Sequence, residues 1–457
     1  MAYSLCDRSL ERLSRAVSLF GLSGGIVNSK WAVEVATSTC WSSQSPEPIV
    51  GSERIFLSLD DSNVMTLPTP VRILHLITDL DRGGAQRQLV SLVSGLSGNG
   101  YEHIVCYLRP PSDFQEELQR NGLNVVGLNV SGPTKWLTAA ARLARLVKSY
   151  QPDIVQTWLM DANISARLNQ LMGPRIPLIT SLQNADYEPE TIQAANLPRK
   201  KVSALRWVDQ FTARLTKPRF VACSNFVMRS ARDRLEIPES SFDVIYNSVD
   251  PETLHCQPGE AQRLRESLTI PPDGFVFLNV GRLDPQKGQE YLLQAFQQVA
   301  AAVPNVFLAI AGDGPREKRL KDMANELGIV DQVRFMGRRS DIGACLEMAD
   351  VFVFPSLFEG LPLALVEAMF KNVPCIVSRI ATLLEVIDED SGLLVAPGSA
   401  DELAAGMMEL YSNPERRKIL GARAGEVAAA RFHRRVTAPQ WQNLYARTIR
   451  EQSKSLV

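Results

Sequence analysis

Residues 275–288 read FVFLNVGRLDPQKG, a largely apolar run that ends at a glycine and a loop with two cations. A short apolar run without polar alternation is typical of a parallel strand that is buried on both faces of its sheet. The following stretch has helical spacing, so the segment predicts a strand, a loop and a helix of a doubly wound sheet. Arg282 and Lys287 lie in the loop, where a helix N-terminus would add free N–H groups, and the segment therefore predicts a diphosphate site.

The same alternation of apolar runs and helical segments extends to both sides of this unit. One series of runs comprises residues 71–77, 103–108, 124–130, 153–158, 177–182, 219–224 and 242–247, and a second comprises residues 275–281, 305–312, 332–337, 351–356, 374–379 and 392–398. Pro and Gly between the series, within 251–272, indicate a linker. The sequence thus predicts an α/β protein with two tandem doubly wound, Rossmann-like domains and an inter-domain cleft.

Residues 1–66 differ from the rest of the chain. Ser, Pro and Gly interrupt every candidate element there, which predicts a disordered extension. The apolar stretch 16–27 after Arg12 and Arg15 imitates a signal peptide, so export is the alternative. Met65 as the true start is a further hypothesis, because regular structure is predicted to begin directly after it.

Composition and charge exclude several classes of protein. The 457 residues include 49 Lys and Arg against 50 Asp and Glu, a net charge of -1 that gives a nucleic-acid partner no support. The 4 His and 7 Cys form no CxxC pair and no HExxH segment, so we expect no zinc site and a reducing, cytoplasmic compartment. No apolar run approaches the roughly 20 residues of a membrane-spanning helix.

Two further loops of the second series carry chemistry. Gly312-Asp313-Gly314-Pro315 follows one predicted strand, and Glu359-Gly360-Leu361-Pro362 follows another and leads into a helix with Glu367. Eight residues along a helix span about 12 Å, so the two glutamates suit hydroxyl groups at opposite ends of an extended ligand such as a nucleotide sugar. Taken alone, Glu359 is better explained as an acid at a helix N-terminus and Glu367 as a solvated helix residue, but the ordered set of loops favours a binding site.

These motifs resemble those of the retaining nucleotide-sugar glycosyltransferases of family four, which have the GT-B fold. The matching segments are GRLDPQKG (281–288), AGDGP (311–315), FPSLFEGLPLALVEAM (354–369) and GLLVAPGSADELA (392–404). The resemblance implies an acceptor-side domain at 67–255, a nucleotide-sugar-binding domain at 256–435, and a final helix at 436–457 that packs back on the first domain.

The resemblance also implies roles for individual residues. Arg282 and Lys287 are expected to stabilise the diphosphate of the donor, and Glu359 to hold hydroxyls of the donor sugar, as the catalytic set. Glu367 is expected to hold the ribose. Further donor contacts are expected from Gly83, Gly84, Gly281, Gly312, Gly360, Leu361 and Pro362.

One position in the first half departs from the family. Many relatives carry a His shortly after the fourth strand, where this chain has Asp161, with Asn163 close by. Asp161 is interpreted either as an acceptor of a hydrogen bond from a sugar hydroxyl or as the cap of the following helix. Both interpretations stay open at this point.

The sequence predicts no metal and no cofactor besides a nucleoside diphosphate sugar. The DxD triplets at 79–81 and 388–390 are interpreted as turn residues. Cationic side chains and a helix terminus can neutralise a leaving diphosphate without a metal ion. The resemblance implies transfer, with retention, to a saccharide or lipid-linked saccharide in polysaccharide or glycoconjugate biosynthesis. The rivals are a sugar-nucleotide epimerase of the same fold and a non-catalytic nucleotide-sugar-binding subunit.

Residues 199–217 read as a basic amphipathic helix. Its apolar stripe at Ala204, Val208, Phe211 and Leu215 is interpreted either as a peripheral contact with the inner face of a membrane or as a face packed inward with the charges in water. The sequence favours the second interpretation.

Overall fold

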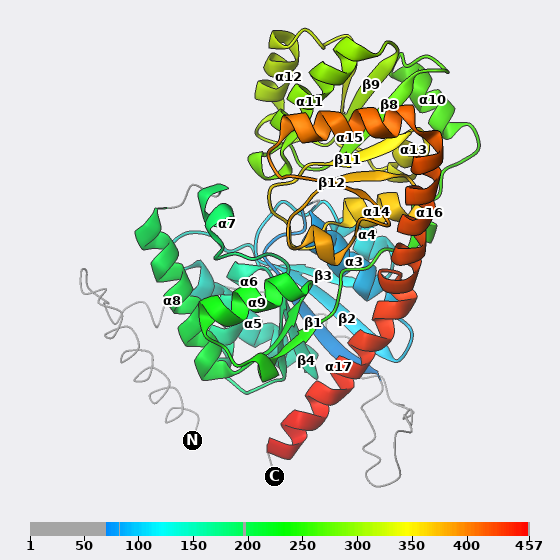
Figure 1. Cartoon of the computed structure of the whole chain (residues 1–457). Helices are drawn as coiled ribbons and strands as arrows, with labels where there is room; N and C mark the ends of the chain where they lie inside the picture. The colour runs from blue at the N-terminus through cyan, green and yellow to red at the C-terminus, as the bar shows by residue number, and fades with distance from the viewer. Residues whose placement is uncertain (1–69, 82, 195–197, 456–457) are drawn as a thin grey trace, which may run out of the picture. The chain divides into compact units, whose positions relative to one another are not determined.

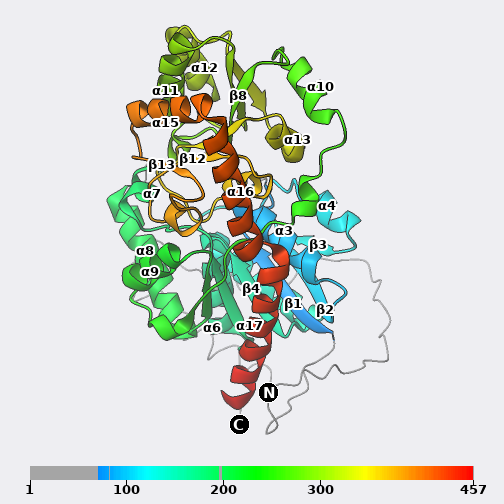
Figure 2. The same ribbon diagram turned by 45° about the vertical axis from the view of Figure 1, so that its right-hand side comes forward.

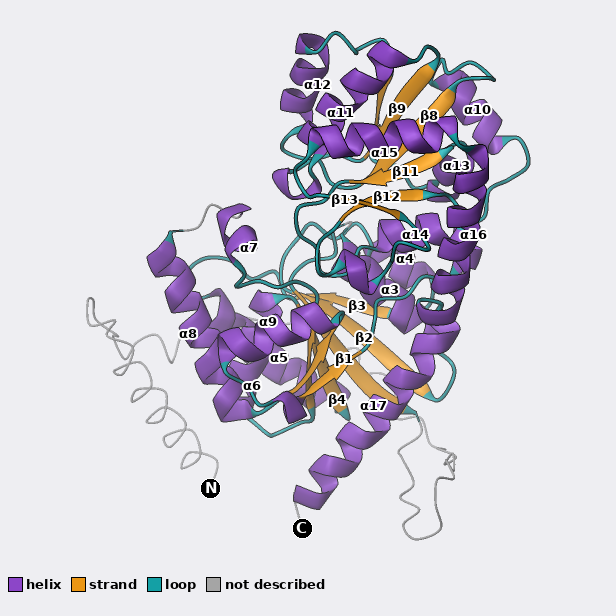
Figure 3. Cartoon of the chain, viewed as in Figure 1, coloured by secondary structure: helices purple, strands orange, loops and turns teal. Residues whose placement is uncertain are grey.

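The computed structural model describes residues 70–81, 83–194 and 198–455 (Figure 1). The interpretations of 1–66, including the signal peptide and Met65, lie outside the described residues. Within the described part, strands form two sheets that are flanked by helices (Figure 3), and this confirms the prediction of two doubly wound α/β sheets.

The first sheet has seven parallel strands in the order β3-β2-β1-β4-β5-β6-β7. Its strands are β1 (Val71–Ile77), β2 (Tyr101–Tyr107), β3 (Asn124–Gly127), β4 (Ile154–Trp158), β5 (Leu178–Leu182), β6 (Arg219–Ala222) and β7 (Phe242–Val244). The helices between them are α3 (Gly84–Leu96), α4 (Gln115–Arg120), α5 (Lys135–Tyr150), α6 (Met160–Met172), α7 (Pro189–Ala194), α8 (Arg199–Thr216), α9 (Asn225–Leu235) and the 3-10 turn η1 (Glu239–Ser241). The order reverses between β1 and β4, so a crevice is expected at their carboxyl ends.

The second sheet has six parallel strands in the order β10-β9-β8-β11-β12-β13. Its strands are β8 (Phe275–Val280), β9 (Val306–Ala311), β10 (Val333–Gly337), β11 (Val351–Phe354), β12 (Cys375–Ser378) and β13 (Leu393–Val395). Its helices and 3-10 turns are η2 (Pro251–Leu254), α10 (Glu260–Ser267), η3 (Pro285–Lys287), α11 (Gln289–Ala302), α12 (Glu317–Glu326), α13 (Ile342–Glu347), α14 (Leu363–Phe370), η4 (Leu383–Glu385), α15 (Ala400–Ser412) and α16 (Pro414–Arg431). The order reverses between β8 and β11, which places a second crevice there.

The last helix, α17 (Arg434–Ser455), lies beside the strands of the first sheet (Figure 2). Its buried Trp441 and Tyr445 pack into the same hydrophobic cluster as Trp158 of β4. The Tyr445 hydroxyl donates a hydrogen bond of 2.7 Å to Oε1 of Gln156. The end of the chain therefore completes the core of the first sheet.

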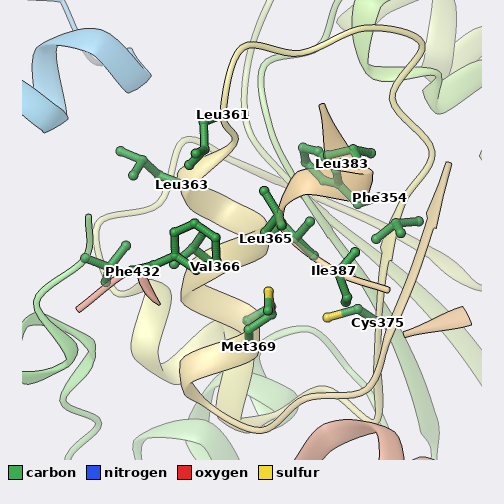
Figure 4. Packing of buried hydrophobic residues seen from close by; sticks show 14 of the residues in the cluster. Phe354, Leu361, Leu363, Leu365, Val366, Met369, Cys375, Leu383, Ile387 and Phe432 are labelled. Atoms are coloured by element: carbon green, nitrogen blue, oxygen red, sulfur yellow. The ribbon is translucent and has the colours of Figure 1, made fainter. Parts of the chain in front are cut away.

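Helix α14 is buried on almost every side. Six of its eight residues are buried, including Glu367. Figure 4 shows Leu365, Val366 and Met369 of this helix within a dense cluster of apolar side chains that includes Phe354 and Phe432. Because close-packed interiors allow side chains few alternative positions, this packing fixes where Glu367 points.

Candidate active site

The loops at the carboxyl ends of β1, β8, β9 and β11 surround one cavity of about 550 Å³. The cavity is lined by Gly83, Gly84, Gly281, Arg282, Lys287, Gly312, Glu359, Gly360, Leu361, Pro362 and Glu367. The structure thus brings together the residues that the sequence singled out for the donor and for catalysis, apart from Asp161 and Asn163. A larger groove of about 740 Å³ lies along residues 251–259 and contains none of them.

Lys287 and Glu359 form an ion pair inside this cavity. The Lys287 ammonium donates to Oε1 of Glu359 at 2.5 Å, and the exposed fractions of the two side chains are 17% and 6%. The ammonium also lies 5.3 Å from the ring centre of Phe354. The pair joins the loop after β8 to the loop after β11, so the cation expected to bind phosphate and the acid expected to bind sugar form one unit.

Arg282 occupies the open side of the same loop. Its side chain is 69% exposed and pairs with Asp284, which is 6% exposed. The Arg282 Nε donates to Oδ2 of Asp284 at 2.6 Å, while Oδ1 of Asp284 accepts from the backbone N–H of Gln286 at 3.0 Å and so caps η3. The carboxylate therefore holds both the turn and the guanidinium.

The glycine of the loop after β9 is required by a close approach of two backbones. Gly312 has φ 147°, and a Cβ at this position would lie 1.9 Å from the carbonyl oxygen of Gly281. No other residue can occupy the position without moving the loops after β8 and β9 apart.

The loop before α14 differs from the expectation in one respect. Pro362 is the N-cap of α14, and the helix begins at Leu363. Glu359 thus precedes the helix, so the span of about 12 Å, which assumed helix throughout, does not apply. The reason is the bend at Gly360, where a Cβ would lie 1.9 Å from the carbonyl oxygen of Gln183 after β5.

Glu367 is buried and lies opposite Arg87 of α3, with 3.6 Å between Oε1 and Nη1. Burial raises the pKa of Glu367, and the nearby Arg87 charge opposes that shift. The sequence interpretation missed Arg87, although a cation one turn after the Gly83-Gly84 pair was a signal.

The sequence interpretation also missed Arg338, which lines the cavity. The Arg338 guanidinium donates to Asp113 at 2.8 Å and to Asp313 at 2.9 Å.

The structure places Asp161 and Asn163 outside the lining of the cavity. The N-cap of α6 is Leu159, without a side-chain cap, so the interpretation of Asp161 as a helix cap is wrong. Asp161 instead accepts hydrogen bonds from Arg109, Lys135 and Trp136. Burial raises the pKa of Asp161, but these hydrogen bonds outweigh it and the net pKa is lowered. Asn163 is buried inside α6, and its Oδ1 has no hydrogen-bond partner in the described residues.

The two DxD triplets have local partners. Asp79 accepts from Gln86 at 2.7 Å, and Oδ1 of Asp388 accepts from the Ser391 hydroxyl at 2.6 Å. Within the described ranges, no group of three or more His, Cys, Asp or Glu is arranged as a metal site.

Two family models match the chain, one for each half. Residues 82–253 match "Glycosyltransferase Family 4", and residues 260–427 match "Glycosyl transferases group 1". Together with the two parallel sheets, these matches identify the chain as a glycosyltransferase of the GT-B fold.

Individual relatives agree with this class. The chain is 24% identical over 380 residues to the lipopolysaccharide core biosynthesis glycosyltransferase LpsD of Rhizobium meliloti, across 83% of this chain and 99% of that one. It is 29% identical over 242 residues to the UDP-Gal:alpha-D-GlcNAc-diphosphoundecaprenol alpha-1,3-galactosyltransferase of Escherichia coli, across 52% of this chain and only 60% of that protein. HepE of Anabaena, solved in complex with UDP-glucose, superposes with a TM-score of 0.72 at 21% identity, over 84% of this chain and 99% of HepE, and so shares the fold.

Proposed function

We propose that this chain is a retaining glycosyltransferase that moves a sugar from a nucleoside diphosphate sugar to a saccharide or lipid-linked saccharide in polysaccharide or glycoconjugate biosynthesis. The observation that carries the proposal is the ion pair between Lys287 and Glu359 in a cavity that Arg282 and Glu367 also line. A cation, an adjacent exposed guanidinium and two acids that line the same cavity match a diphosphate flanked by two sets of hydroxyls. The UDP-glucose complex of HepE supports this choice of donor class.

In the proposed reaction, the bond between the anomeric carbon and the diphosphate oxygen breaks. The acceptor hydroxyl forms its bond to the same face of that carbon, and its proton passes to the departing phosphate oxygen. Arg282 and Lys287 stabilise the negative charge that develops on the diphosphate, and a preorganised cation in a water-poor site acts strongly on such charge. Glu359, held by Lys287, orients the sugar.

A thermal-shift panel of nucleotide sugars tests the donor, because a ligand that binds only the folded state raises its melting temperature. NMR of the transfer product then tests retention of the anomeric configuration. Interconversion of donor sugars without transfer would indicate an epimerase. Donor binding without transfer or hydrolysis, with any acceptor extract, would indicate a binding subunit.

We also propose that transfer needs no metal ion, because Arg282 and Lys287 supply positive charge beside the diphosphate site. Activity measured in EDTA should equal activity in buffer alone. Loss of activity in EDTA and its recovery with Mn²⁺ would contradict this proposal.

Helix α8 supports a proposal of peripheral membrane contact at the cytoplasmic face. The preferred interpretation, that its apolar stripe packs inward, is wrong for half of the stripe: Ala204 and Leu215 are exposed, whereas Val208 and Phe211 are half-buried. The buried residues of α8 are Asp209, Thr212 and Ala213. Asp209 binds the fully buried Arg167, so the face of α8 that carries Asp209 lies inward. Ala204 and Leu215 lie on another face of the helix and stay exposed.

The outward face of α8 combines apolar and basic side chains. Trp207 is 44% and Leu215 is 47% exposed. The exposed Arg206 and Arg214 stand next to them, and Arg214 forms an ion pair with Glu236. Such a face suits an anionic lipid surface. None of the helices in the described part of the chain combines the length and hydropathy of a bilayer span. Sedimentation with phosphatidylglycerol vesicles should weaken at least about fivefold in Trp207→Ser/Leu215→Ser, and not in the control Leu384→Ser, which is 45% exposed on η4.

A further inference from the structure

Three loops of the first sheet converge on Asp161. Arg109 follows β2, Lys135 and Trp136 begin α5 after β3, and Asp161 begins α6 after β4. Oδ2 of Asp161 accepts from Arg109 Nη1 at 2.7 Å and from Lys135 Nζ at 2.7 Å, and Oδ1 accepts from Trp136 Nε1 at 2.8 Å. Because the carboxyl ends of parallel strands share one edge, these residues lie on the side of the sheet where ligands bind.

The cluster keeps an excess of positive charge. Asp161 is 14% exposed and its lowered pKa keeps it ionised at neutral pH, so it neutralises one of the two cations. Arg109 and Lys135 are 42% and 32% exposed. Asp161 is the one acidic partner of either cation among the residues that the structure describes. The remaining N–H groups of both side chains are therefore able to bind an anion.

The position of Lys135 also indicates a site that binds an anion. It is the first residue of α5, and the first turn of that helix holds no acid. A cation at a helix N-terminus is unfavourable because it adds to the positive end of the helix dipole. Such breaches of a local rule concentrate at functional sites, and here the breach strengthens the positive potential around the cluster.

The cluster adjoins the cavity of the proposed active site. Leu159, two residues before Asp161, lines that cavity and has φ 71°, an unfavourable conformation for a leucine. Such strained residues cluster at binding sites. On the other side, the backbone N–H of Arg109 donates to Thr78 O, directly after β1, at 3.1 Å. The cluster thus lies beside the crevice at the carboxyl ends of β1 and β4.

We propose that Arg109 and Lys135 bind an anionic group, a phosphoryl or a carboxylate, of the acceptor. Asp161 and Trp136 act as positioning residues that hold the two cations at the same edge of the sheet. This inference rests on the proposed function, because it assigns the acceptor class to the site where transfer occurs. It also gives Asp161 a role that differs from direct contact with a sugar hydroxyl.

The test measures acceptor-side binding by calorimetry with the full chain saturated with UDP, which occupies the proposed diphosphate site. The probes are farnesyl diphosphate for a phosphoryl source, methyl glucuronide for a carboxylate source, and methyl glucoside as the neutral control. The wild-type chain should bind at least one anionic probe at least about tenfold more tightly than methyl glucoside, because hydrogen bonds between charged groups are strong.

Arg109→Gln/Lys135→Gln should lose that preference about tenfold or more, while UDP still raises the melting temperature as in wild type. Since this variant leaves Asp161 buried without cations, Arg109→Gln/Lys135→Gln/Asp161→Asn serves as a second, charge-balanced version. The control Arg120→Gln/Lys148→Gln removes two exposed cations from α4 and α5 away from the cluster and should bind like wild type.

Two outcomes overturn the inference alone: wild type binds neither anion better than methyl glucoside, or the charge-balanced variant binds the anions as wild type does. If neither UDP nor any nucleotide sugar raises the melting temperature of the wild type or of any variant, the proposed function is overturned instead. Preference for farnesyl diphosphate assigns a phosphoryl acceptor, and preference for methyl glucuronide assigns a carboxylate acceptor.

Discussion

Lys287 and Glu359 form an ion pair of 2.5 Å that joins the loops after β8 and β11. Neither side chain is more than one-fifth exposed. Removing the cation alone leaves a buried carboxylate without its partner, which destabilises a fold much more than removing both charges. The pair therefore has a structural effect that is separable from its proposed role in transfer.

Lys287→Ala should lower kcat/KM by at least about 100-fold and also lower the melting temperature by several degrees, roughly the effect of 2 kcal/mol. Lys287→Ala/Glu359→Gln should regain most of the melting temperature without regaining activity. Calorimetry and initial rates measure the two effects. Equal melting temperatures of the single and double variants would show that the pair has no structural coupling.

Arg282→Ala should separate chemistry from stability more cleanly. Its side chain is 69% exposed, and its partner Asp284 keeps the hydrogen bond from the backbone N–H of Gln286 when Arg282 is removed. We therefore expect kcat to fall about 100-fold with a smaller loss of melting temperature than in Lys287→Ala. A rate within threefold of wild type would remove Arg282 from the proposed mechanism.

Gly360→Ala should hinder the contact between the loop after β11 and the end of β5. The added Cβ would lie 1.9 Å from Gln183 O, a backbone atom that cannot rotate away. We expect kcat/KM to fall at least about tenfold, because small misplacements of a site are costly. In the control Gly173→Ala, the Cβ meets only Asn169 O, at 3.4 Å, and rates should be unchanged. Equal rates in both variants would show that this contact is not needed for turnover.

Glu367 should make stability depend on pH. Its pKa is raised by burial, with partial opposition from Arg87. A carboxyl whose folded pKa exceeds its unfolded value of about 4.5 stabilises the folded chain below that pH, and this contribution is lost as pH rises through the folded pKa. Glu367→Gln should therefore raise the melting temperature at pH 8 more than at pH 4.5, and weaken nucleotide-sugar binding. A pH-independent difference would contradict the raised pKa.

The second-half site was readable from the sequence because its glycines and charges stand directly after apolar runs. Gly312 and Gly360 are required by close contacts with other backbone segments, and such glycines are visible in the sequence. The sequence signal for Arg87 and Arg338 is weaker, because their position at the cavity depends on how the loops of both sheets meet. Only tertiary packing decides such contacts.

The inward face of α8 shows the same limit in a single helix. Its apolar stripe predicted which side is buried, but the buried pair of Arg167 and Asp209 decides the rotation of the helix. A buried cation has to keep its carboxylate partner, and this requirement outweighs the burial of Ala204 and Leu215. Hydrophobic periodicity cannot report a constraint that comes from another helix.

The histidine pair of the first sheet should make the chain sensitive to acid. His75 Nε2 and His103 Nδ1 lie 2.9 Å apart in the core, so one nitrogen donates and the other accepts, and protonation of both rings would set two donors against each other. Burial lowers the pKa of His103 to about 4, and burial together with the His103 charge lowers the pKa of His75 well below 6.5. For a base with a lowered folded pKa, the stabilisation is complete above its unfolded value, about 6.5, and is lost as pH falls towards the folded pKa.

Protonation of His103 alone should lower the free energy of unfolding by about 3 kcal/mol between pH 6.5 and 4. His75→Phe/His103→Phe replaces both rings but leaves the buried Trp158 Nε1 without its acceptor on His75, so the variant should be less stable than wild type at pH 7.5. Its urea unfolding should nevertheless show a flatter acid limb. An acid limb as steep as that of wild type would place the acid sensitivity elsewhere in the chain.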